Sequence, residues 1–486
     1  MTGSGKVTRQ ITSIQRAGAL AITGGLWTSP TDALDTCAYL LPAPLMIRKW
    51  CHRAFVHMAT LPPEHPLYAP VNWKRMHATK RHQGPLHSLS RIYNTKAGRL
   101  KKIPSTPHDA SVAGELPFHI YILMSKENLT REFENTVEEI QVFSDGSAQG
   151  GKVGAAAILT RKDKPDHILH FHLGSNTEHT VYDAELVGMV LAMHLIATKK
   201  RSATQCLIAV DNQVALKAFS SDIQCPGHHL VQEFLLIANR MQKHRRKCRY
   251  KLMLRWSAGH CGIEGNEKAD GEAKKAASRT TSSAKLLPPY LRKLLLMNPT
   301  TVKRAYSDNL INTWKADWLS LTRGKKMGLL DSFTPSTKFL KTISNAKLSC
   351  EVASRIAQLC LQHAPLNSYL FKFKKVDKAN CPACGNKDKS TTHFLLGCPV
   401  YACERWPLAQ LAHRKCKALS LETLLGDPDF AIPLANFIKG TNRFKYNIKT
   451  HMQVLSTILE CKDDIWAAHA SAISQIFTGE PLPPIT

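Results

Sequence analysis

The spacing of apolar positions changes several times along this chain, and the changes divide it into segments. Residues 1–60 carry Ala, Leu and Ile at helical spacing between Gly and Pro breaks, which predicts several short helices. Pro, His, Lys and Arg dominate much of 61–135, which we interpret as a basic, Pro-rich connector. Two interpretations of the connector stay open: its charge contacts phosphates, or it is a solvated linker.

The segment 136–279 has the most regular pattern. Three strand-like apolar runs within 139–174 are separated by turn signals, and a nearly all-apolar run at 180–198 predicts a buried helix. Further helical and strand-like runs alternate after it. Three strands followed by alternating helices and strands predict an α/β layer domain with a mixed sheet.

The remainder of the chain is predicted to be mainly helical. Residues 286–372 read as a helical region, a compact Cys and His group lies within 378–405, and 406–486 return to amphipathic helix. At 486 residues the chain is also too long for one ordinary core, so we expect several domains.

Composition adds a class of partner to this picture. Apolar content of 43% and charged content of 21% are typical of a globular protein, and the net charge of +28 favours a polyanion such as nucleic acid. Lys and Arg outnumber Asp and Glu by 17 to 8 over 1–135, by 20 to 15 over 136–279 and by 28 to 14 beyond. The flanking segments are therefore the most basic parts.

Cysteine usage and hydropathy restrict the compartment. Fourteen cysteines are scattered along the chain with one tight group, which indicates reduced intracellular thiols rather than a disulfide framework. The N-terminus has no apolar signal core, and we find no run of about 18 apolar residues of the kind that a membrane span needs. We therefore expect a soluble protein with no membrane partner, in either nucleus or cytoplasm.

Four acidic residues stand out by position. Asp145 and Asp211 each end an apolar strand-like run, where ligands gather in open α/β sheets. Glu185 lies in the apolar helix with no basic residue at i±3 or i±4, and Asp270 lies on the last helix of the segment. Taken singly, each is a turn, cap or solvent-facing residue; together, with no dedicated basic partner, they suit hard cations, magnesium best.

The motifs around these acids resemble type 1 ribonuclease H. They are DGS at 145–147, AEL at 184–186, DN at 211–212 and W-x-x-x-H-x-G-I-x-G-N-E-x-A-D at 256–270, in the family's order. The resemblance implies a ribonuclease H-like fold, a five-stranded mixed sheet flanked by helices. It also implies that the four acids bind two magnesium ions, with manganese as the alternative, to cut the RNA strand of RNA–DNA hybrids.

The resemblance assigns five further residues. His260, ten residues before Asp270, would assist product release or proton transfer, although a His in a Gly-flanked loop is otherwise simply solvated. Four residues match family positions near the RNA strand, where backbone and amide groups sense the 2'-hydroxyl. They are Gly146, Ser147, Asn212 and Gln213.

The Cys and His group has the spacing of one structural zinc site. Cys381, Cys384, His393 and Cys398 follow the pattern C-x2-C-x8-H-x4-C, and four protein ligands leave no open position for catalysis. Cys403 is a competing ligand, and buried thiols without metal are the alternative interpretation.

This group resembles the zinc-knuckle-like tail after the ribonuclease H domain of non-LTR retrotransposon polyproteins. Residues 16–66 likewise resemble the helical segment that follows the polymerase thumb in those polyproteins, so 1–60 is assigned to it. No F/Y-x-D-D polymerase motif occurs in the sequence, which makes a separate reverse transcriptase the expected partner besides the hybrid.

Three functions remain open on sequence grounds. The first is an endonuclease on hybrids, the second is a catalytically silent nucleic-acid-binding protein with the same fold, and the third is an inert transposon relic. A 3'–5' exonuclease of the related fold would place D-x-E on the first strand, whereas this chain has Asp145, Gly146 and Ser147 there.

Overall fold

The computed structural model groups the chain into two compact units. The described residues are 5–68, 89, 92–93, 97–102, 116–122, 139–161, 164–199, 205–220, 227–244, 251–259, 262–324, 335–386 and 390–444. The first unit is Lys49–Asn309, and the second combines Thr2–Arg48 with Leu310–Thr486. The predicted segments 1–60 and 286–372 are therefore each divided between the units.

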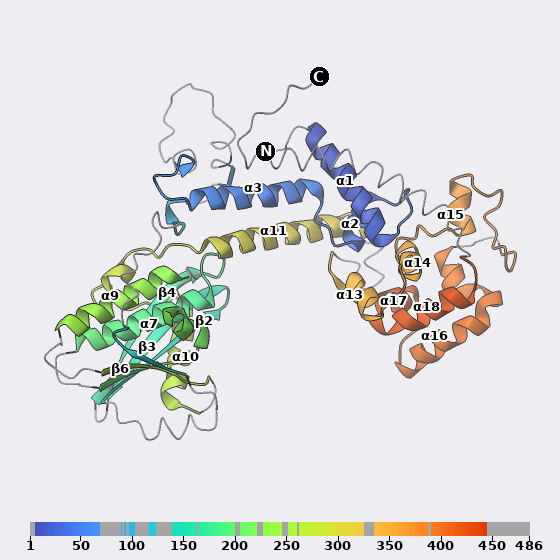
Figure 1. The fold of residues 1–486 in the computed structure, drawn as a ribbon. Helices are drawn as coiled ribbons and strands as arrows, with labels where there is room; N and C mark the ends of the chain where they lie inside the picture. Colours follow the sequence, from blue (N-terminus) through green and yellow to red (C-terminus); the bar gives the residue numbers. More distant parts are fainter. Residues whose placement is uncertain are drawn as a thin grey trace. The chain divides into compact units, whose positions relative to one another are not determined.

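The first unit contains a six-stranded mixed sheet in the order β1-β6-β5-β2-β3-β4 (Figure 1). β1, β6, β5 and β2 pair in parallel, whereas β3 and β4 are antiparallel to their neighbours. The predicted mixed α/β sheet is thus confirmed. The strands are β1 (His119–Tyr121), β2 (Ile140–Gln149), β3 (Lys152–Arg161), β4 (Lys164–Ser175), β5 (Gln205–Val210) and β6 (Lys251–Trp256).

Five strands of this sheet, β2 to β6, lie within the predicted segment 136–279, and β1 adds an unexpected sixth from within the predicted connector. His119–Tyr121 pair with Met253–Arg255 of β6. Phe118, just before β1, is buried, and its ring contacts the rings of Phe219 and Phe234. A three-residue strand is too short to show the alternation that identifies a strand in sequence.

Helices cover both faces of this sheet. They are α7 (Val181–Thr198), α8 (Gln213–Lys217) with the 3-10 turn η3 (Ala218–Ser220), α9 (His228–His244) and α10 (Glu264–Ala277); α3 (Ala43–Ala59) and α11 (Pro299–Ser320) cross the unit boundaries. Val142 and Ile208 belong to the large core with α7 and α9, whereas Phe143 and Ala209 belong to the small core with α10. The period-two alternation along each strand separates these two cores.

Helix α7 is apolar on all sides because it packs against the sheet and against α9. Among the described residues it is the one helix long and apolar enough to cross a membrane by length and composition, but 72% of it is buried inside the unit. That burial is the ordinary situation of a core helix. Thr180 and Asp183 form a capping box at its start, with Asp183 also accepting from Asn298.

Two glycines let helices approach the sheet closely. A Cβ built on Gly146 of β2 would lie 2.4 Å from the backbone nitrogen of Glu185, and one on Gly154 of β3 would lie 2.0 Å from that of Ala277. Both distances are impossible for real Cβ atoms. Glycine at these positions therefore sets how near α7 and α10 lie to the sheet.

The second unit is helical, and its helices other than α15 contribute residues to one apolar core. They are α1 (Gly5–Thr23), α2 (Thr31–Cys37), α13 (Lys338–Asn345), α14 (Cys350–Cys360), α15 (Asn367–Lys372), α16 (Ala402–Arg414), α17 (Leu421–Gly426) and α18 (Ala431–Gly440), with the π-helical turn η5 (His393–Gly397) and the 3-10 turns η6 (Pro399–Tyr401) and η7 (Pro428–Phe430). Leu34, Phe394 and Phe437 are buried in that core. Of the predicted helical tail, residues 445–486 lie outside the described residues.

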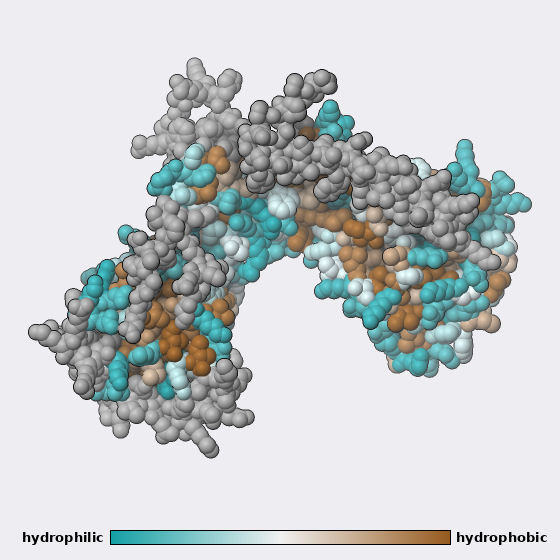
Figure 2. Space-filling model, in the orientation of Figure 1, coloured by the Kyte–Doolittle hydropathy of each residue, from teal (hydrophilic) through white to brown (hydrophobic). Residues whose placement is uncertain are grey.

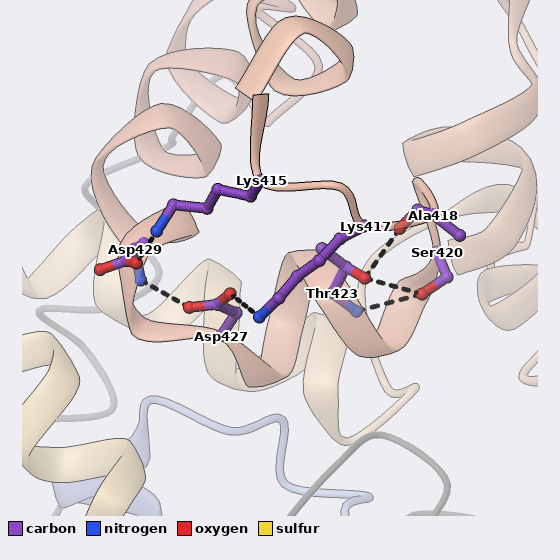
Figure 3. A network of polar contacts seen from close by, with 7 residues as sticks. All are labelled: Lys415, Lys417, Ala418, Ser420, Thr423, Asp427 and Asp429. Atoms are coloured by element: carbon purple, nitrogen blue, oxygen red, sulfur yellow. Dashed lines mark hydrogen bonds and ion pairs between the residues drawn. The ribbon is translucent and has the colours of Figure 1, made fainter. Parts of the chain in front are cut away.

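Polar contacts fix the chain between α16 and α18. Lys417 Nζ donates to Asp427 Oδ2 at 2.7 Å, and Lys415 pairs with Asp429 (Figure 3). The hydroxyl of Thr423 donates to the carbonyl of Ala418 at 2.8 Å. The two lysines that follow α16 are therefore both engaged in ion pairs.

Candidate active site and metal centre

Three of the four predicted acids meet where the parallel part of the sheet ends. β2 pairs with β5 as far as Ser144 opposite Val210, and the next residues are Asp145 and Asp211. Glu185 reaches the same point from the second turn of α7. Carboxylate oxygens of Asp145, Glu185 and Asp211 lie within 4.8 Å of one another.

The position of Asp145 differs from the sequence expectation in one respect. It does not end its strand, because β2 continues to Gln149 by pairing antiparallel with β3, with Gly146 opposite Ala155. The parallel partner β5 is the strand that ends here, because its last residue, Val210, lies opposite Ser144. Asp145 is therefore held within β2 by its pairing with β3, opposite Ala156, while its β5 side is at the open edge of the parallel sheet.

Burial shapes the electrostatics of the cluster. Asp145 and Glu185 are 6% and 5% exposed. Burial, followed by the charges of Asp211 and Asp270, raises the pKa of Asp145 to about 7. Burial and the charges of Asp211 and Asp145 raise the pKa of Glu185 well above its usual range. Protons and a cation therefore compete for the oxygens of these carboxyls.

The hydrogen bonds of Glu185 agree with a place for such a cation. The backbone N–H of Gly146 and the side chain of Asn212 donate to this carboxylate, while its Oε2 is buried and accepts no hydrogen bond from the described residues. A buried oxygen without a donor is costly. A divalent ion ligated by carboxylates would satisfy it.

Asp270 lies beside the three acids with a partner of its own. Its charge raises the pKa of Asp145, but its oxygens are not in the group within 4.8 Å. Lys274 Nζ donates to Asp270 Oδ2 at 2.6 Å. The expectation that no acid has a dedicated basic partner was therefore wrong, and the i,i+4 spacing of Asp270 and Lys274 was the signal in the sequence.

His260 lies outside the described residues, but the chain leading to it is placed. Trp256 Nε1 donates to the carbonyl of Asp211 at 2.9 Å, which joins the end of β6 to the end of β5. A Cβ built on Gly259 would lie 3.3 Å from Oδ2 of Asp211. The residue before His260 thus passes directly beside the acids.

The four residues predicted near the RNA strand have different surroundings. Gly146 is buried against α7, Ser147 is half-buried, and Gln213 is half-buried at the start of α8. Asn212 caps α8: its Oδ1 accepts from the N–H groups of Val214 and Ala215 at 2.9 and 3.1 Å. With its other contact to Glu185, the Asn212 amide is a positioning group, and contact with RNA stays a prediction for all four.

The predicted zinc ligands of the second unit come together. One ligand atom from each of Cys381, Cys384, His393 and Cys398 lies within 4.8 Å of the other three. Sγ of Cys384 is 3.3 Å from Nε2 of His393, and the sulfurs of Cys381 and Cys398 are 3.9 Å apart. Cys403, the competing ligand, is exposed and not in this group.

The backbone between Cys381 and Gly385 forms a tight turn that brings Cys381 and Cys384 to the same site. Gly385 has φ +73°, a conformation that favours glycine, and its N–H donates to the carbonyl of Cys381 at 2.8 Å. Burial alone would raise the pKa of the Cys381 thiol. Hydrogen bonds from the backbone N–H groups of Cys384 and Ala383 and from the side chain of His393 outweigh burial and lower this pKa to about 6. A thiolate is the form that binds a metal.

With both sites described, the chain can be compared with known proteins. The sequence model of the RNase H family matches residues 137–278. Residues 137–278 form an RNase H domain. No curated protein matches the chain.

Several solved structures are similar to this RNase H domain. RNase H1 of the archaeon Halobacterium salinarum is 15% identical over 29% of this chain and 98% of its own, with a TM-score of 0.22. LC11-RNase H1, solved in complex with an RNA/DNA hybrid, is 15% identical over 29% of this chain and 97% of its own, with a TM-score of 0.23. The N-terminal RNase H domain of a Mycobacterium tuberculosis protein is 14% identical over 28% and 98%, with a TM-score of 0.22.

The unit that contains the RNase H domain also carries a basic cleft that sequence reasoning missed. The cleft lies beside the start of α7, and its lining includes His57, Lys101, Lys102, His179, His228, His229 and Lys303. Burial and the charge of Lys101 lower the pKa of His229 to about 3. These residues are scattered through the sequence, so no local pattern could have revealed the cleft.

Proposed function

We propose that the RNase H domain hydrolyses the RNA strand of RNA–DNA hybrids endonucleolytically. The observation that carries the proposal is the cluster of three carboxylates, Asp145, Glu185 and Asp211, inside a domain that matches this family. Asp145 and Glu185 are too buried to be solvated surface charges. Their raised pKa values are typical of groups arranged for function.

In this proposal the three carboxylates and Asp270 hold two magnesium ions, or manganese as the alternative. Such ions, when bound, supply an activated water and stabilise the leaving oxygen of a phosphodiester. The residues of the chain hold and orient them: β2 and β5 fix Asp145 and Asp211, while Asn212 and the Gly146 N–H orient Glu185. Lys274 Nζ donates to Asp270 beside them.

The remaining assignments concern the substrate. His260 would assist proton transfer or product release from the loop that begins beside Asp211. Gly146, Ser147, Asn212 and Gln213 would lie near the RNA strand. The basic cleft would attract phosphates of the hybrid, since its lysines carry positive charge.

Cleavage of a labelled RNA–DNA hybrid tests this proposal. We expect magnesium-dependent loss of the RNA strand only, no cleavage of single-stranded RNA or duplex DNA, and loss of cleavage in Asp145→Asn. Lys275→Ala is the matched control, because Lys275 lies on the same helix as Asp270 but pairs with Glu272. Tight hybrid binding without cleavage by the folded wild-type chain would instead support a catalytically silent binding protein.

For the second unit we propose a structural zinc ion bound by Cys381, Cys384, His393 and Cys398. Three thiols and an imidazole within 4.8 Å, on a turn built around Gly385, suit tetrahedral zinc, and a site closed by four protein ligands has no position for substrate. Its role is then in folding. Zinc content of the purified chain by mass spectrometry, lost in Cys384→Ser, tests the assignment.

We also propose that the chain derives from a non-LTR retrotransposon polyprotein and works beside a separate reverse transcriptase. The order of RNase H domain and Cys and His group supports this origin, as do the sequence motifs of 16–66. Copurification of a polymerase with the tagged chain would test the partnership.

A further inference from the structure

The second unit carries an exposed surface that hybrid cleavage does not explain. It begins in the last turn of α15 and continues in the residues that follow this helix (Figure 1). We call it the α15 surface and define it by its rings and lysines: Phe371, Lys372, Phe373, Lys374, Lys375 and Lys378. At this end of the unit, hydrophobic residues lie between hydrophilic ones on the surface (Figure 2).

Two aromatic rings of the α15 surface face solvent. Phe371 and Phe373 are 49% and 43% exposed. The ring of Phe373 lies 4.9 Å from that of Tyr369, at 50°. Tyr369 is itself fixed, because its hydroxyl bonds to Nδ1 of His363 at 3.2 Å and to Thr28. Exposed rings supported from behind are the form in which proteins stack unpaired bases.

The charge of this surface is unbalanced. Four exposed lysines lie within residues 371–378 against one acid, Asp377. Among the described residues none of the four forms an ion pair, whereas Lys415 and Lys417 of the same unit pair with Asp429 and Asp427 (Figure 3). The ammonium groups of the α15 surface are therefore available to a polyanion.

The turn that presents these lysines is fixed by backbone hydrogen bonds. The N–H of Lys374 donates to the carbonyl of Phe371 and that of Lys375 to the carbonyl of Leu370, each at 3.0 Å. Lys374 has φ +53°, a position after a helix where glycine is usual. The chain thus places a lysine where the backbone alone would favour glycine.

A polar cleft of about 150 Å³ adjoins Tyr369, whose ring contacts that of Phe373. Tyr369 and Lys372 form one part of its lining. The remainder includes the amide of Gln362 and the hydroxyls of Ser368, Ser390, Thr391 and Thr392. Hydroxyl and amide groups beside an ammonium group are donors and acceptors suited to a phosphate or a base edge.

We propose that the α15 surface binds single-stranded nucleic acid. Bases stack on Phe371 and Phe373, phosphates lie along the four lysines, and the cleft takes a phosphate or base edge next to Lys372. Stacking and charge carry no sequence code, so binding is largely indifferent to sequence. This site is separate from the acids of the RNase H domain and does not require cleavage.

Fluorescence anisotropy with a labelled oligodeoxythymidylate tests the proposal on the full zinc-loaded chain. All proteins carry Asp145→Asn, so failure of the cleavage proposal cannot affect the assay. We expect Phe371→Ala with Phe373→Ala to weaken binding about tenfold or more. We expect Lys372→Glu with Lys375→Glu to weaken binding and to reduce the slope of log affinity against log salt by about 1.4 for two phosphates.

The matched control is Lys341→Glu with Lys439→Glu, which makes the same charge change at exposed positions of α13 and α18. We expect it to keep the affinity within about twofold, with the salt slope of the parent. Parental affinity in the Phe variant would overturn the proposal, and so would equal weakening by the two lysine pairs. Sedimentation with phosphatidylserine vesicles checks a membrane surface: vesicle binding lost in the Phe variant, with oligonucleotide binding retained, would also overturn it.

Discussion

At the scale of single residues, the site depends on carboxyl groups kept out of water. Asp145 on β2 and Glu185 near the start of α7 are both buried, and the charge of Asp145 raises the pKa of Glu185. Protons and metal ions therefore compete for the same oxygens. The pKa of about 7 for Asp145 places this competition at the pH of the cell.

The first prediction concerns pH. Cation binding needs ionised carboxylates, so we expect apparent magnesium affinity and hybrid cleavage to rise with pH and to level off above about 7. Titrating magnesium at several pH values measures it. A magnesium affinity that stays constant between about pH 5 and about pH 8 would contradict the raised pKa of Asp145.

The second prediction uses the same pKa for stability. Without metal, Asp145 in the folded chain keeps a proton between pH 3.8 and about 7, whereas the unfolded chain has lost it. The contribution of this bound proton to the free energy of unfolding is therefore lost as pH rises through about 7. We expect Asp145→Asn to raise the unfolding temperature of the metal-free chain above pH 7. The gain should disappear below pH 3.8, where both states are protonated.

The third prediction concerns Lys274. Its exposed ammonium group pairs with Asp270 and lies near enough to Asp145 to lower the pKa of that carboxyl. Removing a positive charge from a cation site strengthens cation binding, so Lys274→Ala should raise magnesium affinity by less than about fivefold. Lys275→Ala, whose partner Glu272 is not one of the four acids, should leave the affinity unchanged. Isothermal titration would measure both.

At the scale of elements, the acids meet because helices lie unusually close to strands. Gly146 brings β2 against the backbone of α7 at Glu185, and Gly154 brings β3 against α10. The carboxylates project from four different elements, so small shifts of a helix separate them. Close packing of backbones therefore sets the distances within the site.

The fourth prediction tests this closeness. A methyl group at Gly146 would lie 2.4 Å from backbone nitrogen, so Gly146→Ala should displace α7 and lower both cleavage and the unfolding temperature. Gly271→Ala is the control, because nothing lies within 4 Å of its Cβ position on α10. We expect it to be neutral or to stabilise the chain by about 0.5–1 kcal/mol. Equal effects of the two substitutions in thermal unfolding would refute the argument.

Sequence patterns predicted these elements unevenly. The all-apolar run of α7 and the acid after β5 could be recognised because each has a local signal. β1 could not, since three residues pair with a strand more than 130 positions away. The basic cleft was missed for the same reason, because contacts between distant segments create it. The pairing of Lys274 with Asp270 was visible as i,i+4 spacing.

At the scale of the whole molecule, the two units have separate cores and different means of stabilisation. The first has a large sheet core, whereas the core of the second includes Cys381 and Cys398, two of the proposed zinc ligands, among its buried residues. Metal binding energy contributes directly to folding in such a case. The stability of the second unit should therefore depend on zinc.

The fifth prediction follows from this dependence. A zinc-selective chelator, or Cys384→Ser, should lower the unfolding transition of the second unit and leave that of the RNase H domain unchanged. Differential scanning calorimetry would resolve the two transitions, and Cys416→Ser, an exposed cysteine outside the ligand group, is the control. A single transition that shifts as a whole would show that zinc does not act on the second unit alone.

The strand β1 has a consequence for how the RNase H domain is isolated. Phe118 and Leu291, which flank the matched residues 137–278 on either side, are buried in the same core as α7. A fragment trimmed to the family boundaries would lose both and leave β6 as an open sheet edge, ready to pair with another molecule. The autonomous folding unit is therefore longer than the homologous region, and aggregation of a trimmed fragment would say nothing about catalytic competence.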